Sequence, residues 1–293
     1  MKRYLGDVLL LITAIVWGSG FVVTAIALEH WTAYQVMAGR FVLATLILCV
    51  LFHQKLRTLS RSVLWKGAVL GTILFVAFAL QTVGLEYTTP SKNAFITAVN
   101  VVIVPVIAYL VFKRRIDRHE TIGSVLALAG IGFMSLQGSM TINLGDFLTL
   151  LCAVGFAFDI FYTNLFVKKE DALSLTIVQF ATASVLSLAA VFVMGEVPAQ
   201  LSSGAVWPIV YLAVFSTTIA YVCQNIAFRY TTPTKAAVIL SLESFFGTAM
   251  SVVFLHEILT GRMVLGAVLI LSAILIAEVK PSLKMRPRVR PEH

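Results

Sequence analysis

The sequence predicts an all-α integral membrane protein with ten transmembrane helices, arranged as two inverted five-helix repeats. Three observations lead to this prediction: the apolar composition, the spacing of the apolar stretches, and an internal repeat. Hydrophobic residues make up 59% of the chain and charged residues 12%, whereas a soluble domain has about 45–50% and about 25%. The mean hydropathy of +0.94 also indicates that lipid is the main solvent.

The apolar residues fall into stretches of the length that a bilayer requires. A hydrocarbon core about 30 Å thick needs about 20 residues of helix, so a chain of this size holds about ten spans. The first stretch exceeds the roughly 7–15 apolar residues of a signal peptide, so we expect it to remain as the first helix. The ten predicted spans are 5–28, 33–52, 64–85, 90–112, 121–136, 145–167, 173–194, 206–228, 233–255 and 263–277.

The basic residues support this number of spans and give an orientation. With the N-terminus inside and ten spans, every Lys and Arg falls at the inner face except Arg40, Lys92 and Arg262. Cytoplasmic loops carry such an excess of basic residues, and a miscounted helix would destroy the pattern. We therefore expect a multi-pass protein of the plasma membrane, the inner membrane of a bacterial cell, with both termini cytoplasmic.

Two segments of the chain are close copies of each other. Residues 87–94 recur as residues 230–237, 143 positions later, with six of eight positions identical. Gln81 and Gln224 share this offset, and Gly6-Asp7 precedes Gly145-Asp146 by 139 positions. Because five helices is an odd number, the second copy enters the membrane from the opposite face, which is typical of secondary transporters. The predicted units are a first repeat at 1–137, a second at 145–279, and a basic cytoplasmic tail at 280–293.

Several short motifs follow one another along the chain: Trp17-Gly18, Arg40, Leu242-Glu243-Ser244, His256-Glu257 and residues 266–270. Their order and spacing resemble the EamA branch of the drug/metabolite transporter superfamily, and the resemblance covers nearly the whole chain. It implies a transporter for small molecules, and most members export amino acids and other metabolites. One departure is Ser244, where the family often has proline after the glutamate.

Two carboxyl groups fall near the middle of predicted spans. Asp159 lies fourteen residues after Gly145, and Glu243 lies ten residues after Pro233. A charge at this depth costs about 2.5–3.5 kcal/mol on insertion scales, so such residues are functional candidates. One interpretation is a neutral carboxyl that is hydrogen-bonded between helices. The other is contact with a substrate amine or proton coupling, because removal from water favours the protonated form of a carboxyl.

Arg40 and Pro105 are candidates for gating. Arg40 lies near the outer end of the second span, where we expect it either to extend to the membrane surface or to pair with Glu29 or Glu86. Direct binding of a substrate carboxylate is the alternative. Pro105 has no amide hydrogen and is expected to kink its helix near Val101.

Uncharged polar and aromatic residues complete the candidate site. Amides and aromatic rings at mid-depth either line a pocket or join helices by hydrogen bonds. Thr89 and Thr232 are expected to cap helices, and the nearby Lys92 and Lys235 to meet lipid phosphates. The predicted substrate-binding residues are Trp17, Gln81, Asn100, Asp159, Tyr162, Tyr221, Gln224 and Glu243, and Asn93, Asn164 and Asn225 have the same character.

Other functional classes lack their signatures in this sequence. It contains no phosphate-binding loop for ATP and no metalloprotease or serine-hydrolase motif, which argues against an enzyme. A membrane-embedded sensor or enzyme without transport activity is the alternative to a transporter. The basic residues are scattered between apolar runs, which argues against binding of nucleic acid. We expect a small-molecule substrate and the lipid bilayer as partners, no metal or other cofactor, and a monomer or homodimer. Proton coupling is a hypothesis.

Overall fold

The computed structural model describes residues 2–113, 117–135, 143–196, 203–227, 230 and 238–279, and every element in these ranges is helical. Within them, eight helices are long and apolar enough to cross a membrane by length and composition. The chain is therefore an all-helical, multi-pass membrane protein, as predicted. The fifth predicted span corresponds to α7, whose first turn carries Arg118 and Glu120, and the ninth contains a shorter apolar helix at Val238–Phe254. The tail at 280–293 and the predicted repeat end at 137 lie outside the described residues.

The described residues of the first half form seven helical elements. Thr32 caps α2 in a capping box with Gln35. Thr89 caps α5 with Pro90 at the first helical position, as the sequence predicted; Thr232 lies outside the described residues. The elements are α1 Lys2–Leu28, α2 Ala33–Leu51, α3 His53–Leu56, α4 Arg61–Leu85, α5 Pro90–Ala98, α6 Asn100–Phe112 and α7 Arg118–Ser135.

The second half follows the first at the predicted offsets. The N-cap of α9 is Asp171, 139 positions after the N-cap Thr32 of α2. Likewise, α14 begins 143 positions after the first residue of α7. The elements are α8 Leu144–Phe166, α9 Ala172–Val193, α10 Ser203–Tyr211, the π-helix η1 Leu212–Ile219, α11 Ala220–Ala227, α13 Leu242–Phe254 and α14 Gly261–Val279.

The fourth and ninth predicted spans are both interrupted. Val99 separates α5 from α6, and Ser241 forms a turn immediately before α13. The interruption at Val99 precedes by two residues the predicted kink at Val101, whose carbonyl loses its usual partner because Pro105 has no amide hydrogen. Discontinuous helices at corresponding positions of two repeats are typical of transporter binding sites.

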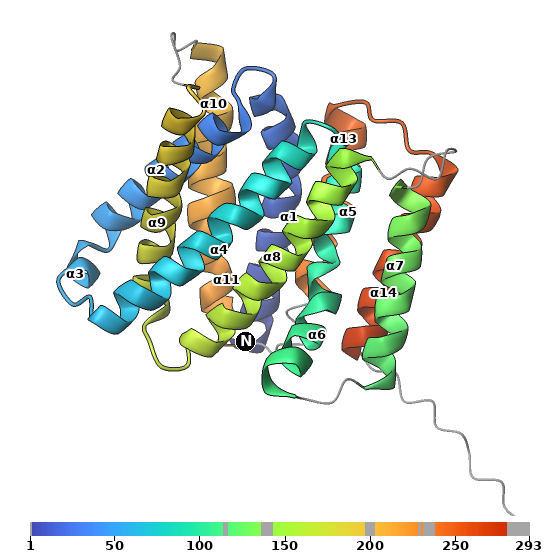
Figure 1. Ribbon diagram of the computed structural model, residues 1–293, viewed down its shortest axis with the longest axis horizontal. Coiled ribbons are helices and arrows are strands. Elements are labelled where there is room, and N and C mark those ends of the chain that lie inside the picture. The colour runs from blue at the N-terminus through green and yellow to red at the C-terminus, as the bar shows by residue number, and fades with distance from the viewer. Residues whose placement is uncertain are drawn as a thin grey trace, which may run out of the picture.

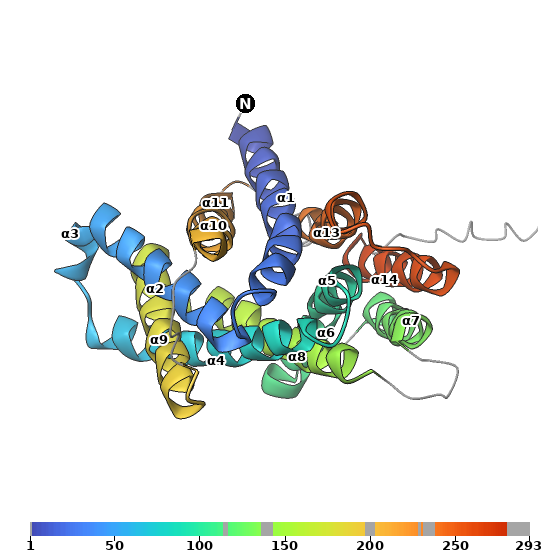
Figure 2. The same ribbon diagram turned by 90° about the horizontal axis from the view of Figure 1, so that it is seen from above.

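The helices pack in a reciprocal pattern. In Figure 2, the α2–α9 pair and the α7–α14 pair lie at opposite ends of the long axis, with the other long helices between them. In that central region α1 packs against α11 and α13, while α8 packs against α4, α5 and α6. In Figure 1, α1 begins at the lower edge of the molecule and α8 begins at the upper edge.

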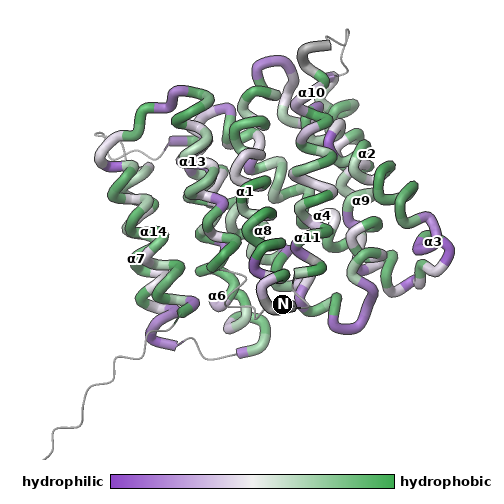
Figure 3. Tube along the Cα trace, turned by 180° about the vertical axis from the view of Figure 1, so that it is seen from behind, coloured by the Kyte–Doolittle hydropathy of each residue, from purple (hydrophilic) through white to green (hydrophobic). Residues whose placement is uncertain are grey.

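The α7–α14 pair is held close by small residues. A Cβ added to Gly130 would lie 2.9 Å from the carbonyl oxygen of Gly266, and one added to Gly266 would lie 2.7 Å from that of Gly130. Such backbone contact is the usual way to bring membrane helices together, because lipid provides no hydrophobic driving force between them. Figure 3 shows apolar residues along the middle of the helices and hydrophilic residues concentrated at the two ends.

Candidate functional site

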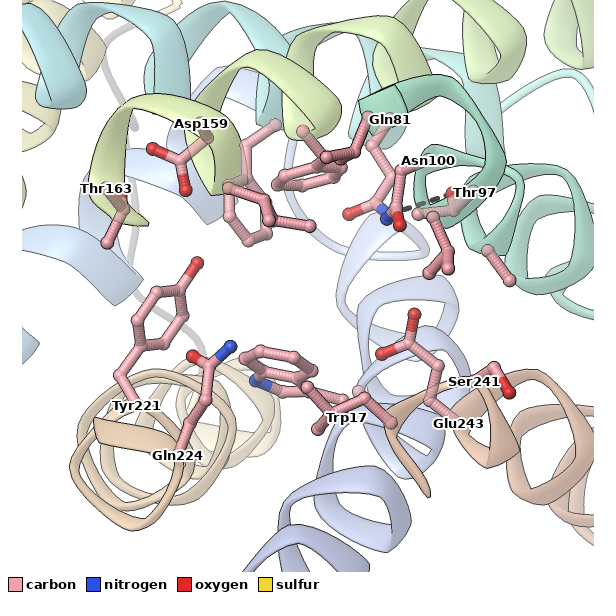
Figure 4. Close-up of a pocket in the computed structure, with 18 of the residues that line it drawn as sticks. Trp17, Gln81, Thr97, Asn100, Asp159, Thr163, Tyr221, Gln224, Ser241 and Glu243 are labelled. Carbon is pink, nitrogen blue, oxygen red and sulfur yellow. Dashed lines mark hydrogen bonds between the residues drawn. The ribbon is translucent and has the colours of Figure 1, made fainter. Parts of the chain in front are cut away.

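A cavity of about 470 Å³ lies between the two halves of the chain. Its walls combine apolar surface with amides, hydroxyls, aromatic rings and carboxyl groups, and they come from α1, α2, α4, α5, α6, α7, α8, α9, η1, α11, α13 and α14. Figure 4 shows these side chains converging on a common space from opposite walls. Among the predicted site residues, those that line the cavity are Trp17, Arg40, Gln81, Asn100, Pro105, Asp159, Tyr221, Gln224 and Glu243.

Tyr162 is the predicted site residue that the structure does not bring to this cavity. Its ring lies 5.3 Å from that of Phe161 and 5.8 Å from that of Phe166, measured between centroids. On α8 the cavity face carries Asp159 and Thr163, four residues apart and therefore on one side of the helix. Tyr162 falls on the neighbouring face, which the depth of a residue in a span does not reveal. The related candidates Asn93 and Asn164 do line the cavity, and the side chain of Asn225 is outside the described part.

Asp159 is held by a residue that the sequence analysis did not select. The Nε2 of Gln179 donates a hydrogen bond of 2.8 Å to Oδ1 of Asp159, and both side chains are buried. Gln179 lies in α9, 139 positions after Arg40 in α2, which is the offset between Gly6 and Gly145. Applying that offset to Arg40 would have identified it.

Arg40 is buried in the protein and does not reach the membrane surface. Only 4% of the residue is exposed. Its Nε and Nη2 donate to Oγ1 of Thr217 at 3.1 and 3.0 Å, and Nη2 lies 3.4 Å from Oγ of Ser216. Its guanidinium carbon also lies 4.4 Å from the ring centroid of Phe78, a cation–π distance. These contacts replace the expected pairing with Glu29 or Glu86 and fasten α2 to η1.

The π-helix η1 provides hydrogen-bond acceptors to both Trp17 and Arg40. A π-helical turn is wider than an α-helical turn and often occurs at functional sites. Here the carbonyl of Ser216 accepts a 2.9 Å hydrogen bond from Nε1 of Trp17, while the Ser216 and Thr217 hydroxyls face Arg40. No sequence pattern marks these two residues, because Ser and Thr side chains in membrane helices commonly form hydrogen bonds with their own helix.

Asn100 and Glu243 occupy corresponding positions of the two halves. They are 143 positions apart, and both lie in the first turn after the interruption of their helix: Asn100 follows Val99 directly, and Glu243 is the second residue after Ser241. Figure 4 shows their polar groups pointing toward each other from opposite walls. Nearby, Nε2 of Gln81 donates to Oγ1 of Thr97 at 3.2 Å. The two interrupted helices thus place an amide and a carboxyl group opposite each other in the cavity.

Carboxylates of the second half hold the first turn of α5, beyond the cavity. Lys92 lies 3.3 Å from Oδ2 of Asp146, whose side chain is fully buried and also accepts from the Thr88 hydroxyl. The expected lipid-phosphate partner of Lys92 is therefore replaced by a side chain of α8, and Lys235 lies outside the described residues. On the other side of α5, Oε2 of Glu257 accepts from the amide and the hydroxyl of Ser91, at 3.3 and 2.7 Å.

The opposite end of the cavity has a different character. There the lining reaches Glu120 in the first turn of α7, Glu278 in the last turn of α14, and the exposed residue Asn164. The cavity is therefore open at the end formed by the start of α7 and the ends of α8 and α14. At the other end it stops short of the residues that hold α5.

Comparison with known proteins agrees with this architecture. The sequence pattern of the EamA-like transporter family matches residues 4–136 and 143–278. An uncharacterized transporter of Archaeoglobus fulgidus is 34% identical over 96% of this chain and 88% of its own. The uncharacterized inner membrane transporter YedA of Escherichia coli K12 is 26% identical over 73% of this chain and 72% of its own. A crystal structure at 16% identity has a TM-score of 0.67 and covers 94% of this chain and 98% of its own, which is a likeness of fold.

Proposed function

The chain belongs to the EamA-like transporter family, and on that premise we propose that it is a secondary transporter that exports a small metabolite, such as an amino acid or a related amphipathic solute, by alternating access. The observation that carries the proposal is the cavity of about 470 Å³ between the two halves, whose apolar walls carry amide, hydroxyl and carboxyl groups. Its side chains come from both repeats and lie at interrupted helices, where transporters commonly bind their substrates.

Reciprocal contacts support two inverted five-helix repeats as the moving parts. Near the start of α1, a Cβ added to Gly6 would lie 3.0 Å from Cβ of Tyr230. Near the start of α8, a Cβ added to Gly145 would lie 2.7 Å from the carbonyl carbon of Tyr87. Gly145 corresponds to Gly6, and Tyr230 corresponds to Tyr87. The glycine of each half therefore contacts the tyrosine of the other half. This reciprocity is what a two-fold axis in the membrane plane produces.

We assign this arrangement to the inward-facing state in the plasma membrane. The open end of the cavity, at Glu120 and Glu278, is the end that the distribution of Lys and Arg assigns to the cytoplasm, together with both termini. The closed end is the one where Lys92 meets Asp146. Opening there and closing at the inner end would complete the transport cycle.

The lining residues take different roles in this proposal. Substrate contacts are assigned to side chains that face the open volume, and gating to Arg40, which joins α2 to η1, and to Pro105 in the wall of α6. Proton coupling is assigned to Asp159 or Glu243, because a carboxyl at this depth gains or loses a proton as water or substrate reaches it. The assigned substrate contacts are Trp17, Gln81, Asn100, Asp159, Tyr221, Gln224 and Glu243.

Counterflow in proteoliposomes tests the proposal. Purified protein is first screened for ligands by thermal shift, and each hit is tested for exchange and for flux driven by a pH gradient. We expect Asp159→Asn or Glu243→Gln to abolish gradient-driven flux, whereas Glu29→Gln, an exposed position with the same change of charge, retains it. Gradient-driven flux that survives both cavity replacements eliminates proton coupling. Binding without exchange of any hit would replace the transporter by a membrane sensor.

A further inference from the structure

We propose that the cavity selects an organic cation, an amine or quaternary ammonium group on an aromatic or apolar body, over zwitterions and anions of the same shape. This inference rests on the proposed transport function and narrows its substrates to cationic solutes, in place of the zwitterionic amino acids given there as an example. It follows from the charge of the described lining, from the capacity of its carboxyl groups to accept further hydrogen bonds, and from the position of its aromatic rings.

The described lining residues carry more acidic than basic groups. Asp159 and Glu243 lie in its central part, and Glu120 and Glu278 lie at its open end. Arg40 is the one Lys or Arg in the described lining. Clefts lined by one sign of charge concentrate solutes of the opposite sign, most strongly where the walls are apolar. The cavity therefore favours entry of a cation.

Arg40 is already committed to the protein. Its Nε and Nη2 are directed at the hydroxyls of Ser216 and Thr217, its plane faces Phe78, and it is 4% exposed. A substrate carboxylate would have to break these contacts to reach it. Trp17, the indole donor of the lining, is likewise engaged with the carbonyl of Ser216. A carboxylate on the solute thus finds neutral amides in the cavity and no free cation among the described side chains.

The two central carboxyl groups have capacity left to accept hydrogen bonds. Among the described residues, Gln179 provides the one hydrogen bond to Asp159, on Oδ1. Glu243 receives none from the described residues, and Figure 4 shows its carboxyl group directed into the open space. A buried carboxylate is costly unless it is paired, so a cationic solute would supply the missing partner. An anionic solute would add a like charge instead.

Aromatic rings lie between these carboxyl groups. In Figure 4, Tyr221 stands below Asp159, and Trp17 stands between Tyr221 and Glu243. The two rings meet edge to face with centroids 5.4 Å apart, which leaves indole surface turned to the cavity. The face of Trp is the best aromatic partner for a desolvated cation. Carboxyl groups flanked by aromatic rings therefore fit a cation that carries an apolar or aromatic body.

The test uses four probes that share one phenyl ring and differ in charge: phenethylamine, its N-trimethylammonium derivative, phenylalanine and 3-phenylpropionate. Their dissociation constants are measured on the purified full-length protein by titration calorimetry and by quenching of tryptophan fluorescence. We expect both cations to bind at least tenfold more tightly than phenylalanine or phenylpropionate. Glu243→Gln and Asp159→Asn should each weaken cation binding at least tenfold, whereas Glu29→Gln should leave it unchanged.

Selectivity of the unaltered protein keeps the test decisive even where a variant fails to fold. Equal or tighter binding of phenylalanine or phenylpropionate overturns the inference, and so does the absence of binding by either cation. Neither result touches the proposed transport function, which fails only when no bound solute undergoes counterflow. Cation binding without counterflow would uphold the charge selectivity and remove the transport.

Discussion

Gln179 donates a 2.8 Å hydrogen bond to Asp159 and so connects α9 to the middle of α8 inside the cavity wall. Both residues belong to the second half of the chain, and both are buried. A buried carboxyl that loses its donor costs about 1–3 kcal/mol. The pair therefore both stabilises the fold and fixes the direction in which Asp159 faces the cavity.

Replacing Gln179 by Leu should lower the free energy of unfolding by about 1–3 kcal/mol, because Asp159 keeps its burial and loses its partner. Thermal unfolding in detergent measures the change. In combination with Asp159→Ala the two effects should not add, since they remove the same bond. Additive effects would mean that the hydrogen bond contributes nothing.

Tyr221→Phe should weaken solute binding several-fold, because its hydroxyl faces the cavity beside Asp159 (Figure 4). Tyr162→Phe is the matched control, because that ring packs against Phe161 and Phe166 outside the cavity. The measurement is the dissociation constant of a solute found in the thermal-shift screen. A loss of affinity in Tyr162→Phe alone would reverse the assignment of α8 faces.

Gly18→Ala should destabilise the protein by about 1–3 kcal/mol, the usual cost of overpacking. The added Cβ would lie 2.7 Å from the amide nitrogen of Gly247 and 2.8 Å from the carbonyl oxygen of Glu243, and backbone atoms cannot move aside cheaply. Gly261→Ala is the control, because a Cβ there meets no atom within 4 Å. Equal melting temperatures for the two variants would show that α1 and α13 tolerate a wider separation.

Lys92→Met should increase access to the cavity from outside. Lys92 ties the first turn of α5 to Asp146, so its loss favours states in which that end is open. A single cysteine replacing Leu85, in a chain without its three native cysteines, should react several-fold faster with an impermeant maleimide in intact cells. Lys55→Met removes the exposed pair with Asp171 and should not change the rate. An unchanged rate in Lys92→Met would exclude this pair from the outer closure.

Glu170 should make the stability of the protein depend on pH. Hydrogen bonds from Lys66 and Ser62 hold the pKa of Glu170 below its ordinary value of 4.5. A carboxyl with a lowered folded-state pKa stabilises the fold above its unfolded-state pKa, and this contribution disappears as the pH falls through the lowered value. Glu170→Gln should therefore melt at a lower temperature than the native protein near pH 6, and the difference should shrink steadily as the pH falls below 4.5. A constant difference across this range would contradict the assignment.

Much of the site was accessible from the sequence because a membrane makes polar residues conspicuous. Asp159 and Glu243 stood out since a charge in hydrocarbon is costly without a purpose, and the offset of 143 positions linked Gln81 to Gln224. The sequence analysis did not select Gln179, because an uncharged amide is common in a membrane span that already contains other polar residues. It also did not select Ser216 and Thr217, because their contacts depend on a π-helical turn that no local sequence pattern predicts.

The sequence by itself determined that the chain crosses a membrane many times and that its two halves are copies, because span length and hydropathy are local properties imposed by the thickness of the bilayer. Only the tertiary structure decided which polar residues meet. Tyr162 packs against Phe161 outside the cavity, Arg40 donates to hydroxyls of η1 instead of pairing with Glu29 or Glu86, and Lys92 pairs with Asp146. The reason is that a side chain's partners depend on the rotation of each helix about its axis, which packing against distant helices sets.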